Sequence, residues 1–465
     1  MKIPYWPIYT GPNKDFNNSV LRVKYILSEL NNPHLQLKNI IHITGTKGKG
    51  STALYISNIL KASGYIVNTY ISPHIYECNE RILLNGNKIT DEKLNEITEV
   101  VRYVCEQKNN NNLFNKEGFI EPAMFEALTC SAFYAMSQNN ADFNVIEVGM
   151  GGLNDATNVF DKNPPIACVF TPIHLDHTKF LGDTIQQIAL NKSFLIKKNT
   201  KNVILSSQAK EVKTVLKKIA NELEVPSVIS YKDDYEVFYD KNNQPVYESS
   251  YFDTCFPFQR PNMSGDYQLI NAGCAISVCL SCQKNSIANK LTLDAINAGI
   301  KNTTNIVRMQ QVTNGTLFSQ LPQGSIFYID GAHNQLAAHA LASWINEFKK
   351  QYNKNDYKIC IAIARTKNAN NISFLQEFLD KDKKPIVDLI IATRANLESI
   401  PEPPENIAKA AQTLGFLYKT AYNINEVIKC SIDNNNETNS FYKKKILLIC
   451  TGSLYIARDI SVANL

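Results

Sequence analysis

The sequence lacks an apolar run long enough to cross a membrane. Its clearest apolar stretches have the length of a strand, such as residues 40–43, whereas a helix that spans a bilayer needs ~20 apolar residues. The first eleven residues also lack the apolar core of a secretory signal peptide. We therefore expect a cytoplasmic protein without a membrane partner.

A strong excess of charge of one sign is missing as well. The 465 residues include 48 Lys and Arg against 43 Asp and Glu, a formal net charge of +5, and no long basic run occurs. Since nucleic-acid-binding surfaces are usually clustered basic patches or stripes, we expect no nucleic-acid partner. Small molecules are the partners that remain.

The sequence also lacks a cysteine framework. Its eleven cysteines are an odd number and stand among apolar residues, which is typical of reduced, buried thiols. Cys279 and Cys282 form one C-x-x-C motif, but neither a second pair nor a nearby histidine accompanies it. The pattern does not indicate a zinc or redox site.

Strand-like apolar runs alternate with segments of helical period along the chain, which predicts an α/β fold around mostly parallel sheets. A length of 465 residues exceeds one ordinary core, so we expect two domains, residues 1–302 and 303–465. Residues 230–261 predict a small antiparallel β appendage on the first domain. The expected strands are 40–44, 65–71, 144–148, 166–171, 203–206, 326–329, 359–364, 389–393 and 446–450, and the expected helices are 51–63, 90–105, one from about 184, and 209–223.

A glycine-rich loop, Thr44-Gly45-Thr46-Lys47-Gly48-Lys49-Gly50-Ser51-Thr52, joins the first strand to a helix. Such a loop lets backbone N–H groups surround phosphate oxygens, and Lys49 can reach the β- and γ-phosphates. The loop departs from the general G-x-x-x-x-G-K-[ST] rule, because Ile43 occupies the leading glycine position and Gly50 separates Lys49 from Ser51. The alternative is a flexible surface turn. The residues expected to bind ATP are Gly45, Thr46, Gly48, Lys49, Gly50, Ser51 and Thr52.

This loop resembles the phosphate loop of folylpolyglutamate and dihydrofolate synthases, a branch of the Mur ligase superfamily in which the inserted glycine is a family feature. Further segments are similar to motifs of the same branch, in the same order and over nearly the full length. They are residues 70–74 with 79–82, 147–152 with 155–158, 175–178 with 180–185, and 330–334. The resemblance implies an N-terminal P-loop ATPase-type domain with a mostly parallel sheet and a C-terminal Rossmann-like α/β domain.

The resemblance also implies a Mg²⁺ site formed by Ser51, Ser72, Glu147 and His177. A carboxylate at a strand end beside a phosphate loop suits Mg²⁺ that bridges two phosphates. Each residue alone has another interpretation: Glu147 as a loop cap, and His177 as a side chain held by Asp176.

Lys192 matches the lysine that superfamily members carry as a carbamate, although Asn191 stands where the family has a glutamate. The alternative is an ordinary solvated lysine on a helix surface. On the first interpretation, Lys192 joins Lys49, Asp330 and His333 as the candidate catalytic residues.

The remaining site residues follow from the resemblance too. The pterin pocket would be bordered by Ser72, Pro73, His74, Arg81 and Phe125. Asn271 would lie near the adenine and Arg308 would bind phosphate, although the family's W-P-G-R reads Asn305-Ile306-Val307-Arg308 here. Asp330 and His333 would contact the transferred phosphate or the incoming glutamate. Asp330 is also counted among the residues that bind ATP, and His333 is a candidate base.

The implied reaction is an ATP- and Mg²⁺-dependent ligation. A carboxylate would become an acyl phosphate and then be attacked by the amine of L-glutamate, with dihydropteroate, folates or both as the acceptor. Whether a monovalent cation assists stays open, and we expect a monomer. Two alternatives remain: a UDP-muramoyl amino-acid ligase, and a P-loop nucleotide-binding protein without ligase activity. The second has less support, because a protein without ligase activity has no need of the acidic and histidine residues at the expected metal positions.

Overall fold

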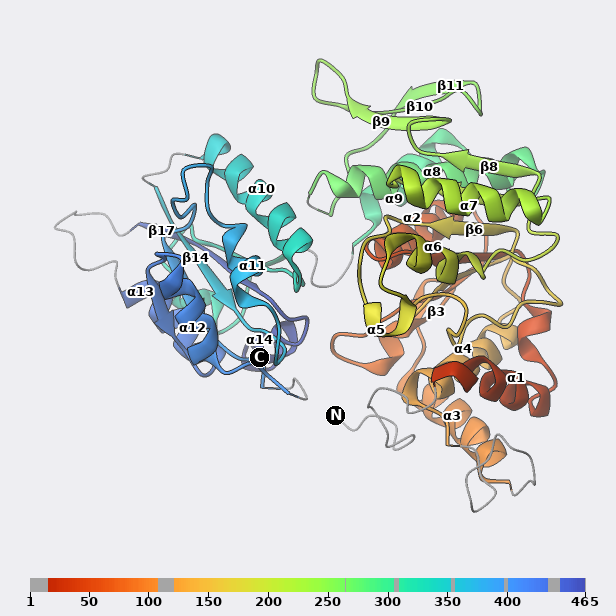
Figure 1. Ribbon diagram of the computed structural model, residues 1–465, viewed down its shortest axis with the longest axis horizontal. Coiled ribbons are helices and arrows are strands. Elements are labelled where there is room, and N and C mark those ends of the chain that lie inside the picture. The colour runs from red at the N-terminus through yellow and green to blue at the C-terminus, as the bar shows by residue number, and fades with distance from the viewer. Residues whose placement is uncertain are drawn as a thin grey trace. The chain divides into compact units, whose positions relative to one another are not determined.

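The computed structural model describes residues 16–107, 121–263, 265–304, 309–352, 356–396, 400–433 and 444–464. The chain forms two compact units. The first unit comprises Met1–Asn262 with Asp266–Thr304, and the second comprises Met263–Gly265 with Asn305–Leu465. In Figure 1 the first unit runs from red to green and the second from teal to blue.

An eight-stranded sheet forms the centre of the first unit, in the order β4-β3-β2-β5-β1-β6-β7-β8. The six strands from β2 to β8 in this order are parallel, and the edge strands β3 and β4 are antiparallel. Strands that are covered on both faces read as continuous apolar runs, as the buried residues of β1 and β5 do. The strands are β1 Ile40–Thr44, β2 Val67–Tyr70, β3 Ile82–Leu84, β4 Asn87–Lys88, β5 Phe143–Glu147, β6 Ala167–Phe170, β7 Asn202–Leu205 and β8 Ser227–Ser230.

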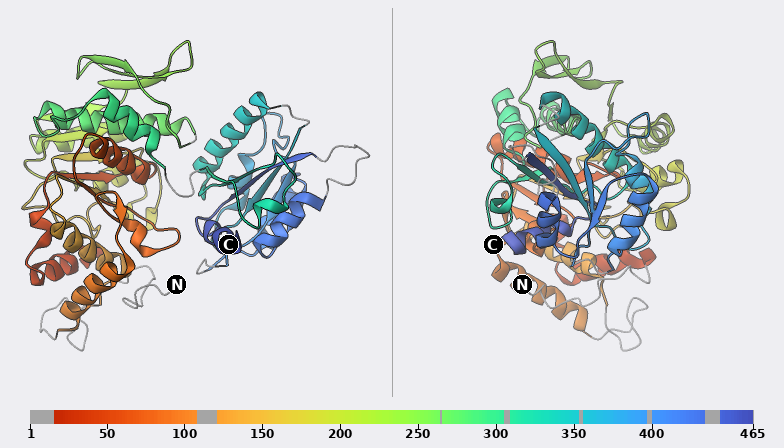
Figure 2. Two further views of the ribbon diagram at one scale, coloured as in Figure 1. Left: turned by 180° about the vertical axis from the view of Figure 1, so that it is seen from behind. Right: turned by 90° about the vertical axis from the view of Figure 1, so that its left-hand side faces the viewer.

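Helices cover this sheet in three groups (Figure 2). Helices α2, α8 and α9 pack together, α1, α3 and α4 enclose an apolar core with β2, and α6 and α7 enclose another with β6 and β7. Threonines cap two helices, since Thr90 accepts a hydrogen bond from the Lys93 amide and Thr184 from the Gln187 amide. The helices are α1 Ser19–Glu29, α2 Lys49–Ala62, α3 Asp91–Glu106, α4 Met124–Gln138, α5 Thr178–Leu181, α6 Ile185–Ser193, α7 Lys210–Glu222, α8 Tyr267–Lys284 and α9 Leu293–Asn302, with short 3₁₀ turns at Phe16–Asn18, Pro33–Gln36 and Cys78–Arg81.

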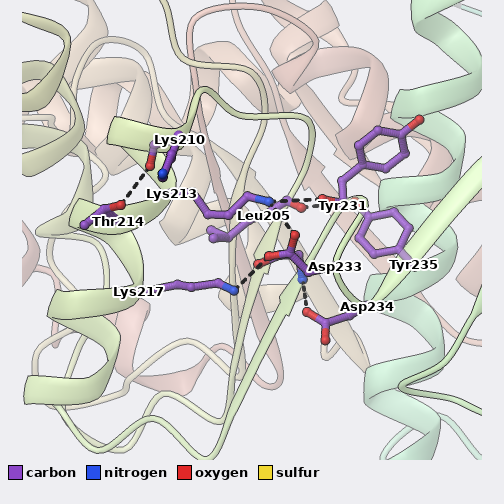
Figure 3. A network of polar contacts seen from close by, with 10 residues as sticks. Leu205, Lys210, Lys213, Thr214, Lys217, Tyr231, Asp233, Asp234 and Tyr235 are labelled. Carbon is purple, nitrogen blue, oxygen red and sulfur yellow. Dashed lines mark hydrogen bonds and ion pairs between the residues drawn. The ribbon is translucent and has the colours of Figure 1, made fainter.

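The predicted appendage is a three-stranded antiparallel sheet in the order β11-β10-β9. Its strands are β9 Tyr235–Tyr239, β10 Pro245–Ser249 and β11 Thr254–Pro257. The buried Tyr247 hydroxyl lies 2.9 Å from the Ser277 hydroxyl of α8. At the turn before β9, Asp233 accepts hydrogen bonds from Lys213 and Lys217 of α7 at 2.8 and 2.9 Å (Figure 3). These contacts join the appendage to the helices of the first unit.

The second unit is a six-stranded sheet in the order β12-β13-β17-β14-β15-β16, in which β12 alone is antiparallel to its neighbour. The strands predicted in this half of the chain are therefore confirmed, and so is the α/β class. The elements are β12 Gln310–Val312, β13 Ile326–Ile329, β14 Tyr357–Ile363, β15 Leu389–Ala392, β16 Tyr418–Thr420, β17 Lys445–Thr451, α10 Gln335–Gln351, α11 Asn371–Gln376, α12 Pro404–Thr413, α13 Ile424–Ile432 and α14 Ile456–Asn464, with a 3₁₀ turn at Phe318–Gln320.

The structure corrects three details of the prediction. The helix expected at 51–63 begins at Lys49, because Gly48 adopts a left-handed conformation and starts the helix inside the loop. The strand expected at 65–71 is shorter, Val67–Tyr70. The large sheet gains a further parallel strand, β8, just before the appendage.

The structure also bears on two features that the sequence lacks, a cysteine framework and a membrane-spanning run. All eleven cysteines are free thiols, and burial raises the pKa of Cys282 to about 12, so the C-x-x-C pair on α8 is an apolar part of the core. In the described part of the chain, no helix has both the length and the apolar character needed to cross a membrane.

Candidate active site

The glycine loop of the first unit ends on the N-terminus of α2. Its start is held by the segment that follows β6, because the amides of Thr46 and Lys47 donate hydrogen bonds to the Pro172 carbonyl at 2.9 and 3.3 Å. The first bond of the helical ladder runs from the Thr52 amide to the Gly48 carbonyl, at 2.9 Å. The three amides before Thr52 therefore lie at the helix end, where backbone N–H groups and the helix dipole favour a phosphate.

Close approaches explain why this loop needs its glycines. A Cβ atom on Gly45 would lie 1.9 Å from the Thr171 hydroxyl oxygen, and one on Gly48 would lie 2.5 Å from the Asn271 side-chain oxygen. A Cβ atom on Gly50 would lie 3.2 Å from a carboxylate oxygen of Glu147. The glycine that breaks the general phosphate-loop rule thus lets the Glu147 carboxylate approach the first turn of α2.

Glu147 lies at the end of β5, and it is buried with only 3% of its surface exposed. Its carboxylate accepts a hydrogen bond from the Ser72 amide at 2.8 Å. The Ser51 hydroxyl, in the first turn of α2, lies 3.5 Å from the Gln268 side-chain nitrogen. The structure therefore brings Glu147 against both Ser72 and the start of α2, which is one part of the predicted metal site.

This donor set fits Mg²⁺ bound together with a nucleotide. The described residues contain no group of three or more His, Cys, Asp or Glu side chains that could hold a metal by themselves. Mg²⁺ at nucleotide sites usually takes one or two carboxylates and completes its shell with phosphate and water oxygens. One buried carboxylate against the first turn of the phosphate-loop helix meets that requirement.

His177 occupies the turn before α5 and adopts a left-handed conformation, with φ of 48°. Its side chain is 55% exposed, and its Nε2 atom lies 3.8 Å from an Asp176 carboxylate oxygen. This distance is too long for a hydrogen bond, so the contact does not decide between a metal ligand and a ring held by Asp176. Its role as a metal ligand stays a prediction.

Lys192 is buried on α6 with 3% of its surface exposed, so the alternative of a solvated helix lysine is wrong. Its ammonium nitrogen donates a hydrogen bond to the Gly45 carbonyl at 3.0 Å. Burial, and then the nearby charge of Lys49, lower the pKa of Lys192 to about 7, although Asp176 and Asp155 oppose the shift. At neutral pH a large fraction of the Lys192 side chain is therefore the neutral amine. The neutral amine is the form that can combine with CO₂.

The predicted pterin residues meet in a second cluster of the first unit. The Arg81 Nε donates a hydrogen bond to His74 Nδ1 at 2.8 Å, so the neutral His74 ring carries its proton on Nε2. The Arg81 guanidinium lies 5.8 Å from the centre of the Phe125 ring, which in turn stacks on Tyr70 at 5.9 Å. A cation beside stacked aromatic rings suits a flat heteroaromatic ligand.

Sequence reasoning missed the ion pair that holds Phe125 in place. Arg22 of α1 donates two hydrogen bonds to the carboxylate of Glu126, at 2.9 and 2.7 Å, and both side chains are buried. The same carboxylate accepts the Ala123 amide at 3.0 Å and thereby caps α4. No local pattern could have paired residues that are 104 positions apart.

Among the predicted nucleotide contacts, Asn271 lies against Gly48, and its side-chain nitrogen donates to Gln268 at 3.0 Å. The start of α8 therefore closes one side of the phosphate loop. Arg308 lies outside the described residues.

In the second unit, Asp330 directly follows β13, and its carboxylate accepts the amides of Met309 and Ala332 at 3.1 and 2.9 Å. The Nδ1 atom of His333 lies 2.9 Å from the Gly331 carbonyl. Because a carbonyl only accepts, Nδ1 carries the proton and Nε2 is the basic nitrogen of the neutral ring. The structure thus makes Asp330 a loop-holding residue and orients His333.

Arg365, which sequence reasoning missed, completes this edge. It follows β14 and is 4% exposed, and its Nη1 donates to the His333 carbonyl at 2.8 Å. Its guanidinium carbon lies 4.2 Å from the centre of the Phe374 ring, and burial lowers the pKa of Arg365 to about 10. Within the described part of the chain, no carboxylate lies within 4 Å of this guanidinium, and its Nε–H has no hydrogen-bond partner.

The charge of Glu402 is near enough to oppose this shift of the Arg365 pKa, but no ion pair forms within the described residues. A buried guanidinium without a paired carboxylate is uncommon, because an unpaired buried charge is costly. Its position at the carboxyl ends of parallel strands is where ligands bind in α/β folds. The signal in the sequence was an arginine directly after an apolar strand, at the end of the predicted 359–364 segment.

Comparison with known proteins gives matches to two family models. The model described as Mur ligase middle domain matches residues 43–279, and the one described as dihydrofolate synthetase, C-terminal domain matches residues 317–463.

Individual relatives match over nearly their whole length. The chain is 25% identical to a dihydrofolate synthetase of Saccharomyces cerevisiae, covering 94% of this chain and 96% of the yeast protein. It is 27% identical to a dihydrofolate synthase/folylpolyglutamate synthase of Bacillus subtilis, covering 94% and 93%. Among solved structures, a folylpolyglutamate synthase of Thermotoga maritima superposes with a TM-score of 0.74 at 26% identity, covering 96% of this chain and 94% of that one.

Proposed function

The chain belongs to the Mur ligase family, and on that basis we propose that it is an ATP-dependent ligase that joins L-glutamate to dihydropteroate and to folates. The relatives that match over their whole length carry dihydrofolate synthase and folylpolyglutamate synthase activities in their names. The observation that carries the proposal is the approach of Glu147 to Gly50, because it explains the loop that departs from the general nucleotide-binding rule. The match of residues 317–463 to a dihydrofolate synthetase domain supports the folate branch over a UDP-muramoyl ligase.

The first unit would bind ATP and the acceptor carboxylate. The amides at the start of α2 and the Lys49 ammonium would hold the phosphates, while Glu147, Ser51 and Ser72 would hold Mg²⁺. Mg²⁺ bound there would offset negative charge on the β- and γ-phosphates. The acceptor carboxylate would take the γ-phosphoryl group to give an acyl phosphate and ADP.

Lys192 carries a finer part of the proposal, a carbamate that would turn a cation into an anion beside the loop. Its burial, its contact with the Gly45 carbonyl and its lowered pKa support this role. Protein equilibrated with ¹³C-bicarbonate should show a carbamate carbon signal that a Lys192→Met variant lacks. A signal of equal size in both proteins would contradict the assignment.

The second unit would supply the groups that act on L-glutamate. An amine attacks only in its neutral form, and the Nε2 atom of His333 is suited to accept its proton. The buried Arg365 guanidinium would bind a carboxylate of the glutamate, since a guanidinium matches a carboxylate through two parallel hydrogen bonds. Asp330 would hold the loop between them through its two backbone contacts.

The acceptor would place its pterin against Phe125 and Arg81, beside His74. This cluster lies far along the chain from the glutamate groups and is formed wholly by the first unit. The proposal includes dihydropteroate and folates as acceptors, a cytoplasmic location and a monomeric state. Exchange of K⁺ for Na⁺ in the assay tests whether a monovalent cation assists the reaction.

The test is an assay of ADP release with ATP and Mg²⁺. Release should require both L-glutamate and a pteroate or folate acceptor, and mass spectrometry should show one added glutamate. Parallel reactions with dihydropteroate and tetrahydrofolate would assign the acceptor. Release with a UDP-muramoyl substrate would indicate a cell-wall ligase, and substrate-independent hydrolysis would indicate a P-loop protein without ligase activity.

A further inference from the structure

A cavity of about 340 Å³ lies in the first unit at the amino ends of two strands. Asn202 and Ser227, which line it, are the first residues of β7 and β8. The phosphate loop follows the carboxyl end of β1, and β1, β6, β7 and β8 are parallel. The cavity is therefore at the opposite edge of the sheet from the candidate active site.

Two lysines give this cavity a positive charge. Lys201 and Lys284 line it, and no acidic residue does. Within the described residues, the Lys201 ammonium makes no hydrogen bond or ion pair. The Lys284 ammonium lies 4.0 Å from the centre of the Tyr251 ring and donates to the Tyr251 carbonyl at 3.3 Å. An ammonium has three N–H donors, so Lys284 keeps donors for a ligand.

The other walls are polar and already connected. The Ser227 hydroxyl lies 2.8 Å from the Tyr251 hydroxyl. The Asn285 side chain donates to the Asn202 side chain at 3.1 Å and to the Ser281 carbonyl at 3.0 Å. Because protein donors satisfy this carbonyl at the end of α8, the negative end of the helix dipole is partly compensated there. An anion would meet hydroxyl and amide groups that are held in place before it binds.

We propose that this cavity binds a small phosphorylated molecule. Lysines act as point charges and serve phosphate well, whereas sites built for carboxylates commonly use the planar fork of arginine, which is absent from this lining. A volume of about 340 Å³ is at the lower end for small-molecule sites, so the ligand is a compact phosphate ester rather than a nucleotide.

Such a ligand would join three parts of the first unit. Tyr251 belongs to the turn between β10 and β11 of the appendage, and Lys284 to the last turn of α8. Ser227 begins β8 of the large sheet, and Lys201 directly precedes β7. Along α8, Lys284 lies 13 residues from Asn271, a rise of about 20 Å, so the cavity is distinct from the phosphate loop. Binding there can be measured while a nucleotide occupies that loop.

The experiment is hydrogen exchange of the full chain saturated with Mg²⁺ and ADP, with glycerol 3-phosphate titrated as the probe. Exchange should slow in peptides that cover residues 199–204, 225–229, 249–254 and 281–287. Inorganic phosphate should slow exchange in the same segments, while neutral glycerol should leave the exchange rate unchanged. Glutarate, a dicarboxylate of similar size, should bind more weakly.

Lysine variants test the charges directly. Lys201→Met with Lys284→Met should raise the dissociation constant of glycerol 3-phosphate at least about tenfold. The matched control is Lys218→Met with Lys241→Met, which removes two exposed lysines of the same unit outside the cavity and should leave binding unchanged. If the double variant folds poorly, the single variant Lys201→Met tests the same charge, because within the described residues the Lys201 ammonium makes no hydrogen bond or ion pair that the change would remove.

Three results would overturn the proposal. The first is an unchanged hydrogen-exchange rate in all four segments at 20-fold molar excess and at about 10 mM glycerol 3-phosphate. The second is an equal dissociation constant for the cavity variant and its control. The third is binding of glutarate without binding of either phosphate probe. None of these depends on whether the protein is a folate ligase.

Discussion

The two units both place functional groups at the carboxyl ends of parallel strands, but they build their sites from different parts of the residue. The phosphate loop is mainly backbone, and neighbouring side chains leave no room for a Cβ atom on Gly45 or Gly48. The edge of the second unit is mainly side chain, where Arg365 and His333 are placed by packing and by hydrogen bonds to the backbone. A site made of backbone leaves glycines in the sequence, whereas one made of side chains leaves only common residue types.

The strongest test of the backbone-built site is Gly48→Ala, with Gly64→Ala as the matched control. Both glycines have φ of +82°, but a Cβ atom on Gly48 meets Asn271 at 2.5 Å, whereas one on Gly64 meets nothing within 4 Å. We expect glutamate-dependent ADP release to fall by about 100-fold in Gly48→Ala, since small displacements in a phosphate site have effects of this size.

Gly64→Ala should only lower the free energy of unfolding, by about 1 kcal/mol, because alanine is strained at this φ. ADP release and urea unfolding, measured on both variants, separate the two effects. Equal loss of activity in both would mean that backbone strain, and not the approach to Asn271, governs the loop.

The side-chain-built site is tested by Arg365→Lys. Lysine keeps the charge but loses the two parallel donors, so we expect the KM for L-glutamate to rise about 10- to 100-fold while the KM for ATP stays unchanged. Arg394→Lys, an exposed arginine of the same unit, is the control and should have no effect. An equal change in both KM values would argue against a glutamate contact.

Lys192 tests whether the first unit also depends on a buried side chain. Its pKa is about 7 in the folded chain, against an ordinary value of 10.5 for a solvated lysine. Between these values the unfolded chain binds a proton that the folded chain does not, so the stability of the native protein should rise with pH, by up to about 1.4 kcal/mol per pH unit. Below pH 7 both states bind the proton and the full penalty remains.

Urea unfolding at pH 7 to 9 in CO₂-free buffer checks this prediction. A Lys192→Met variant should lack the added slope, so native protein should gain stability relative to the variant as pH rises. Parallel pH profiles of the two proteins would show that the lysine is charged in the folded chain.

The smallest effect is expected outside both sites, at the ion pairs of Asp233 with Lys213 and Lys217. These groups are partly exposed, so Asp233→Asn should cost less than about 1 kcal/mol of unfolding free energy, and less still at 1 M salt. Glu222→Gln, which faces Lys218 on α7 at 3.8 Å, is the control and should cost nothing measurable. A larger loss for Asp233→Asn would mean that the appendage supports the first unit.

Much of the fold was predictable, because its signals are local. The buried strands read as apolar runs, Thr90 marked the start of α3, and the glycine loop marked the start of α2. Strand β8, Ser227–Ser230, was missed because it has only four residues and a serine at each end. Local pattern did not reveal that it pairs with β7.

The candidate site was predictable only in part. The match to a known family identified Ser72, Glu147 and Lys192, and the structure then showed that Glu147 contacts Ser72 and that Lys192 is buried. Arg365 was missed because an arginine after a strand is ordinary until its burial and its missing carboxylate partner are seen. The role of His177 stays a prediction.

By itself, the sequence determined the α/β class, the parallel strands and the phosphate loop, because backbone geometry restricts which residues can form them. Only the tertiary structure decided which side chains share a surface. It placed Glu147 against Gly50, removed Lys192 from water and, among the described residues, left the Nε–H of the Arg365 guanidinium without a hydrogen-bond acceptor. Burial and charge depend on neighbours that are distant along the chain, and they set the chemistry of each group.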